Sequence, residues 1–124
     1  MNYDDVNALA LRVRASFESR DLVAFGELLS DDVRWGDDHH PRGCRNRAQV
    51  IATFQNALAN GLDGTINELV VGTNAILCGL NVSWPTGAPR SAESIYHVYL
   101  IRDNLIAAIQ RFDDRASAAT AAGI

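Results

Sequence analysis

The chain has 124 residues, with 15 acidic side chains, 11 basic ones, a formal net charge of −4 and 48% apolar residues. This composition suits one domain with a substantial core and excludes a disordered segment or a fibre. The acidic balance argues against nucleic-acid binding. All eleven basic residues are arginines, which excludes chemistry that needs a lysine nucleophile or Schiff base.

The start of the chain indicates no export. Residues 1–5 are acidic where a secretory signal is basic, and no apolar segment follows them. No apolar run approaches the ~20 residues that a membrane helix needs. Two cysteines are too few for a disulfide framework. We therefore expect a cytoplasmic protein with free thiols and no membrane partner.

The first half of the chain predicts three helices and a short strand. Apolar residues at spacings of three and four from Val6 to Phe17 indicate the first helix. Asp21 is a candidate N-cap for a second helix that continues to Leu29, and residues 30–32 are expected to end it. A short strand is expected at 33–35. After a polar loop, Asn46 with Gln49 resembles a capping box for a third helix.

The second half predicts four longer strands. They are expected at residues 65–71, 75–84, 92–102 and 105–112, with a tight hairpin turn at Asp103 and Asn104. The alanine-rich residues 116–124 indicate a frayed tail or a short, weakly packed helix.

This order of helices followed by strands indicates an α+β fold, with a curved and mainly antiparallel sheet wrapped around three N-terminal helices. Such a sheet encloses a cone, and the mouth of the cone is a natural place for an apolar pocket.

Three stretches of the sequence resemble the nuclear transport factor 2-like (cystatin-like) superfamily, in its SnoaL-like and ketosteroid-isomerase-like branch. They are residues 20–33, residues 42–47 before the third helix, and residues 98–115 around the hairpin. The resemblance implies a single SnoaL-like domain over residues 1–115 followed by a tail over 116–124. It also implies a cone-shaped pocket for a small apolar molecule, a homodimer through the outer face of the sheet, and no cofactor or metal.

The resemblance also implies candidate catalytic residues. The general base of ketosteroid isomerases falls on Asp37, in the stretch Asp31 to Asp37. One of their oxyanion donors falls on Val13 and is lost, while the other falls on Tyr96, whose hydroxyl is expected to replace it. Where polyketide cyclases and epoxide hydrolases have an acidic residue on the last strand, this chain has Arg111.

These assignments leave alternatives open. Asp37 is either a general base with a raised pKa or an acid in solvent beside Asp38. Tyr96 either faces the pocket, with Val98 and Leu100, or only packs in the core. In the first case His97 faces outward.

Two further sets of polar residues have either a chemical role or only a structural one. His39 and His40 either line the mouth as an acid/base partner or lie in a solvent loop, and their spacing does not favour a metal site. Cys44, among Arg42, Arg45 and Arg47, is either a reactive thiol or anion site or an inert thiol among surface ion pairs.

The expected ligand contacts are mainly apolar. Two large aromatic residues near strand ends are expected to form core or pocket wall, and Arg111 either points into the pocket, where it can hold a carboxylate, or lies on the sheet surface. The predicted ligand-binding residues are Trp35, Phe54, Trp84, Val98 and Arg111.

We therefore expect a small-molecule-binding protein. Its activity is expected to be proton transfer of the isomerase, cyclase or dehydratase type, with Asp37 as base. The alternative is a non-catalytic dimerising or ligand-sensing module.

Overall fold

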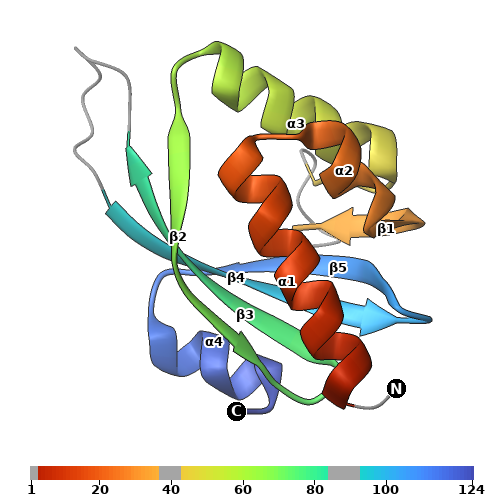
Figure 1. The fold of residues 1–124 in the computed structure, drawn as a ribbon. Coiled ribbons are helices and arrows are strands. Elements are labelled where there is room, and N and C mark those ends of the chain that lie inside the picture. The colour runs from red at the N-terminus through yellow and green to blue at the C-terminus, as the bar shows by residue number, and fades with distance from the viewer. Residues whose placement is uncertain (1–2, 37–42, 84–92) are drawn as a thin grey trace.

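The computed structural model describes residues 3–36, 43–83 and 93–124 and contains a sheet with helices on both faces (Figure 1). Three helices precede or interrupt the strands, and a fourth ends the chain. In chain order the elements are α1 (Tyr3–Ser19), α2 (Leu22–Glu27), β1 (Leu29–Trp35), α3 (Arg47–Ala59), β2 (Asp63–Val71), β3 (Ala75–Ser83), β4 (Glu93–Arg102), β5 (Leu105–Phe112) and α4 (Arg115–Ala122).

The predicted helix starts are confirmed at α2 and α3. The side chain of Asp21 accepts a hydrogen bond from the backbone N–H of Ala24 at 3.0 Å. Asn46 accepts one from the N–H of Gln49, whose side chain in turn accepts from the N–H of Arg45. These contacts satisfy backbone donors that the first turn of a helix leaves without intrahelical partners.

The second helix ends earlier than the sequence predicted. It stops at Glu27, and the chain enters β1 at Leu29 rather than at Val33. Pairing with β5 accounts for the difference, because Leu29 lies opposite Ile106 and the hydroxyl of Ser30 donates to the carbonyl of Ile106. The local apolar pattern predicts a last helical turn here, but pairing with a strand that is distant in sequence makes these residues part of β1.

The sheet has the order β1-β5-β4-β3-β2, with β1 and β5 parallel and the other neighbours antiparallel. The predicted hairpin turn is confirmed, because Asp103 and Asn104 both have a positive φ, as a tight two-residue turn requires. Beyond this turn the register of β4 and β5 shifts between Leu100 and Ile101. This irregularity decides which side chains of β4 share a face with those of β5.

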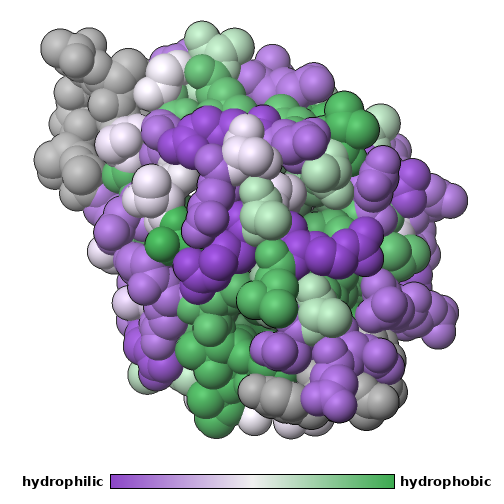
Figure 2. Space-filling model, in the orientation of Figure 1, coloured by the Kyte–Doolittle hydropathy of each residue, from purple (hydrophilic) through white to green (hydrophobic). Residues whose placement is uncertain are grey.

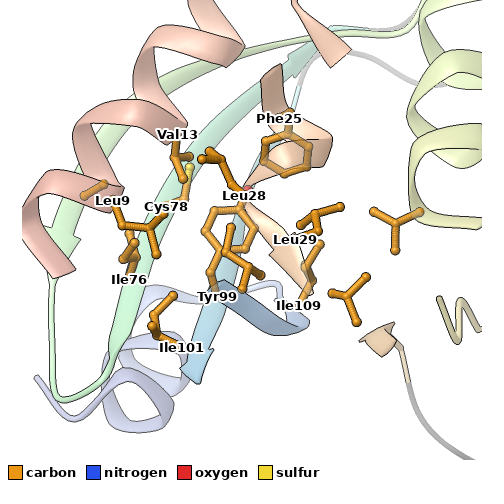
Figure 3. Close-up of a cluster of buried hydrophobic side chains, with 14 of the residues drawn as sticks. Leu9, Val13, Phe25, Leu28, Leu29, Ile76, Cys78, Tyr99, Ile101 and Ile109 are labelled. Carbon is orange, nitrogen blue, oxygen red and sulfur yellow. The ribbon is translucent and has the colours of Figure 1, made fainter. Parts of the chain in front are cut away.

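The main core lies between the sheet and α1, α2 and α3, on what we call the inner face. Figure 3 shows Tyr99 of β4 between side chains of α1, such as Val13, and Leu29 of β1. Tyr99 and Val13 are fully buried. The apolar pattern predicted for α1 is confirmed, since Val6, Leu9 and Val13 all contribute to this core.

The opposite, outer face carries α4 (Figure 1). Its N-cap is Asp114, which accepts from the backbone N–H of Ser117, and its alanines Ala118 and Ala122 are buried against the sheet. The end of α4 lies so close to Gly72 that a Cβ there would be 2.0 Å from the carbonyl oxygen of Ala122. The alanine-rich segment is therefore a docked helix and not a frayed tail.

Beyond α4, the outer face is polar at the start of β4, where the side chains of Asn67 and Ser94 both donate to that of Asn81. The homodimer through this face stays a prediction.

Polar groups cover much of the surface on the side of α1, and apolar surface gathers towards the lower end of the view (Figure 2). Within the described ranges, no helix is both long and apolar enough to cross a membrane.

Candidate functional site

A cavity of about 290 Å³ lies between the inner face of the sheet and the three N-terminal helices. Its size is near the lower end of the ~300–1,000 Å³ range of ligand pockets, which suits a molecule of one or two rings. Apolar side chains provide most of the wall. The lining residues used below are Phe17, Arg20, Phe25, Trp35, Phe54, Ala57, Asp63, Leu80, Val82, Glu93, Ile95, His97 and Arg111.

Aromatic rings from four elements form one side of the cavity. Phe17 of α1 and Phe25 of α2 meet edge to face, with ring centroids 5.4 Å apart, and Phe54 of α3 packs against both. Trp35 of β1 stacks on Phe54 at 5.0 Å. Because each ring is held by another, this wall is preorganised for an apolar ligand.

A row of three residues with polar groups crosses the inner face of the sheet beside these rings. In the register of the three strands, Cys78 of β3 lies opposite His97 of β4, and His97 lies opposite Arg111 of β5. Directly opposed residues share one face of a sheet, so all three are on the inner face. Leu80 and Ile95 form the next pair, towards the start of β4. His97 thus stands between the apolar part of the cavity and the buried core around Tyr99.

His97 is held by its neighbours in one position. Its ring packs edge to face on Trp35, with centroids 5.5 Å apart, and its Nδ1 is 3.4 Å from the hydroxyl of Tyr99. Tyr99 in turn contacts the thiol of Cys78. The contact with Tyr99 occupies Nδ1, which leaves Nε2 as the ring nitrogen for a ligand.

Burial keeps His97 neutral. The residue is only 3% exposed, and this burial, with the positive charge of Arg111 as a second cause, lowers its pKa from 6.5 to about 4. Burial also raises the pKa of Cys78 to about 12, so its thiol stays protonated. At neutral pH the wall therefore presents a neutral imidazole, which either donates or accepts a hydrogen bond at Nε2.

Two ion pairs stand at the rim of the cavity. The guanidinium of Arg20 donates to both carboxylate oxygens of Asp63, at 3.0 and 2.6 Å, and this contact lowers the pKa of Asp63. Nη2 of Arg111 is 3.7 Å from Oε1 of Glu93. Both pairs are partly exposed, so water screens them.

Three of the predicted ligand-binding residues meet at this cavity, namely Trp35, Phe54 and Arg111. Two other predicted residues do not. Tyr96 and Val98 lie on the outer face, where they pack with the buried alanines of α4. Their alternation with His97 was predicted, but the faces are exchanged, so His97 points inward and Tyr96 cannot supply the oxyanion donor of this cavity.

Four predicted residues lie outside the described part of the chain: Asp37, His39, His40 and Trp84. Their roles stay predictions. Within the described ranges, no three His, Cys, Asp or Glu side chains are grouped so that they could hold a metal ion.

Cys44 contacts both α3 and β1. Its Sγ is 3.3 Å from Oγ1 of Thr53, and its backbone pairs with that of Trp35. Arg47 donates to the carbonyl of Leu29 and pairs with Asp31 at 3.0 Å. For Arg47 the structure supports the prediction of a surface ion pair, and Arg42 lies outside the described residues.

The sequence interpretation missed His97 and Glu93 as cavity residues. Both share one face of β4 with Ile95 and Tyr99, and a polar residue on an apolar face of a strand is a usable signal. The alternation left two faces to choose from, and only the packing of the sheet against the helices shows which of them is inward.

Comparison with known proteins gives a family and a fold. Residues 10–109 match the model of the SnoaL-like domain. No curated protein matches the chain significantly.

Three solved structures illustrate the fold, each with a different name. A candidate ketosteroid isomerase from Kribbella flavida DSM 17836 is 17% identical with a TM-score of 0.72, over 90% of this chain and 79% of that one. An LEH-like epoxide hydrolase from M. tuberculosis is 13% identical with a TM-score of 0.67, over 90% and 84%. A nuclear transport factor 2-like protein of unknown function from Burkholderia pseudomallei K96243 is 17% identical with a TM-score of 0.68, over 97% of both chains. At these identities the likeness is one of fold.

Proposed function

Because the chain belongs to the SnoaL-like domain family, we propose that it binds a small, mainly apolar molecule in the cavity between its helices and its sheet. We propose further that it moves a proton on this molecule without a cofactor, as an isomerase, cyclase or dehydratase does. The observation that carries the proposal is the cavity itself, with its apolar wall and a buried neutral imidazole on one side.

The aromatic wall supports the binding part of this proposal. Four rings held against one another exclude water and lose little freedom when a ligand enters. A few polar groups on an otherwise apolar wall orient such a ligand. The names of two structural neighbours, a candidate ketosteroid isomerase and an LEH-like epoxide hydrolase, are compatible with small organic substrates.

The chemistry of His97 supports the proton-transfer part. If Tyr99 donates to Nδ1, then Nε2 carries the proton and can donate to an oxygen of the ligand on which negative charge develops. A neutral imidazole is suited to this role because it needs no charge buried in an apolar wall. In this proposal Asp37, the position of the family's general base, takes the proton from the carbon.

A non-catalytic, ligand-sensing module is the second candidate. It is favoured by Arg111, because a guanidinium keeps its proton at any physiological pH and cannot act as an acid or base. Tight binding without any conversion of the ligand would support this candidate. A pH–rate profile with two ionisations would support the enzyme.

The test of binding is the thermal unfolding midpoint, measured with a panel of steroids, polyketide-like aromatics, terpenoids and terpenoid epoxides. A ligand at one hundred times its dissociation constant stabilises the folded state by about 2.7 kcal/mol. For a chain of this length that raises the midpoint by roughly 10 °C. No shift with any compound of the panel would argue against the cavity as a binding site.

A cavity-filling variant ties the shift to the cavity. Ala57 of α3 lines the wall, so Ala57→Trp should fill the space and remove the midpoint shift. Ala52 is an exposed residue of the same helix, and Ala52→Trp should keep it. Equal shifts in both variants would place the ligand elsewhere. Near-UV circular dichroism of the free variants checks that both remain folded.

A further inference from the structure

Arg111 differs from the other cavity arginine in how it is paired. Arg20 makes a two-pronged contact with Asp63, at 2.6 and 3.0 Å. Nη2 of Arg111, in contrast, is 3.7 Å from Glu93 and 3.4 Å from Asp113. Charge-assisted hydrogen bonds between a guanidinium and a carboxylate are about 2.7–2.9 Å long, so neither of these contacts is one.

The position of Arg111 makes this looser pairing relevant to ligand binding. It lies directly opposite His97 on the neighbouring strand, and its charge is one cause of the lowered pKa of His97. A permanent positive charge and a neutral hydrogen-bonding ring thus stand side by side at the wall of an apolar cavity. A guanidinium there can hold negative charge but cannot transfer a proton.

We propose that Arg111 anchors a negatively charged oxygen group of the ligand, so that the ligand is an apolar carboxylic acid or a similar oxyacid of one or two rings. The acid group binds at Arg111 beside His97, and the rings lie against Trp35 and Phe54. This inference rests on the proposed function, because it assigns a class of ligand to the same cavity.

Glu93 opposes the binding of such a ligand. Its carboxylate lies at the same rim and would both repel an acid and compete for Arg111. The side chain of Asp113 is 86% exposed, so it can turn towards water when an acid takes its place, and that of Glu93 is 38% exposed. Removing the charge of Glu93 should therefore strengthen the binding of an acid, while removing that of Arg111 should weaken it.

The test uses three probes with one carbon skeleton and different charges: 2-naphthoate, 2-naphthamide and 2-naphthylmethylammonium. Dissociation constants are measured by isothermal titration calorimetry at pH 7.5 for the wild type, Arg111→Gln, Glu93→Gln and Arg102→Gln. Arg102 is a matched control, because it is a partly exposed arginine of the sheet, paired with Asp32 and not among the cavity-lining residues.

We expect the wild type to bind 2-naphthoate at least about 10-fold more tightly than 2-naphthamide, as one charge-assisted contact provides. Arg111→Gln should remove this difference while keeping the affinity for the amide, which also shows that the variant is folded. Glu93→Gln should lower the dissociation constant for 2-naphthoate several-fold and leave that for the amide unchanged. Arg102→Gln should behave as the wild type.

Equal binding of acid and amide, or preferred binding of the ammonium probe, would overturn the inference and leave the proposed binding function standing. The same holds if Arg111→Gln weakens acid and amide equally, or if Glu93→Gln weakens the acid. If none of the three probes binds, both the inference and the proposed binding function lose their support.

Discussion

Lowering the pH from 7.5 to 5 should reduce the free energy of unfolding by about 2 kcal/mol through His97 alone. Burial lowers the pKa of this imidazole to about 4, whereas in the unfolded chain it has its ordinary value near 6.5. Below pH 6.5 the unfolded chain therefore binds a proton that the folded protein excludes. The stabilisation is fully present above pH 6.5, falls between pH 6.5 and 4, and amounts to about 3 kcal/mol in all.

The measurement is urea unfolding at several pH values for the wild type and His97→Asn, in which the amide takes a position near Nδ1. The slope of the free energy of unfolding against pH is compared between the two proteins. The difference in this slope isolates His97, because every other titrating group is present in both. Carboxylates with lowered pKa values, such as Asp63 and Glu68, lose their stabilisation only below about pH 4.5. An equal slope in the two proteins between pH 7 and 5 would show that His97 is not buried and neutral.

Replacing Asp37 with asparagine should reduce turnover by at least about 100-fold if the protein transfers a proton, since general acid–base catalysis contributes roughly 10²–10⁴-fold. Asparagine has the shape of aspartate but cannot take up the proton. The readout is kcat/KM with a compound from the ligand panel that is converted, together with the thermal shift it produces. The shift should be kept, because the change removes a proton acceptor and not the cavity.

The neighbouring acid provides the control. Asp38→Asn removes the same charge one residue further along the chain and should leave kcat/KM within a few-fold of the wild type. If Asp37→Asn keeps its rate, the general base is another residue, and the proposed mechanism is wrong. A loss of rate in His97→Gln with unchanged ligand affinity would support the oxyanion role of His97.

Much of the fold could be predicted because its signals are local. The side chains of Asp21 and Asn46 cap helices by accepting from backbone N–H groups three residues away, and the turn at Asp103 and Asn104 requires only residues that accept a positive φ. The alternation of the strands was also readable. The start of β1 was not, because it depends on pairing between Leu29 and Ile106, which are distant in sequence.

The inward position of Arg111 has a specific cause, a bulge in β5. The turn pairs Arg102 with Leu105 and Ile101 with Ile106, and this register, continued without interruption, would place Tyr96 opposite Arg111. The shift before Leu100 places His97 there instead. The extra residue is Ala107 of β5, so the side chains of β5 beyond it change face, while those of β4 alternate without interruption. No residue type in the sequence indicates this bulge, so the sequence could not show that Arg111 lies on the same face as His97.

The docked C-terminal helix was hard to predict for another reason. Its cap, Asp114, and its buried alanines fit a helix, but small side chains give a weak hydrophobic signal. Its end also makes a close approach to Gly72, where there is no Cβ to keep the backbones apart. Such a contact is visible only once the outer face of the sheet is known.

The central claim, that ligands bind at the inner face of the sheet, is tested most directly by nuclear Overhauser effects between bound 2-naphthamide and methyl groups of the protein. Leu80 and Ile95 line the cavity, while Leu77 and Val98, on the same two strands, pack on the outer face. The structure predicts ligand contacts to the methyl groups of Leu80 and Ile95 and none to those of Leu77 and Val98. Contacts to Leu77 and Val98 instead would contradict the account.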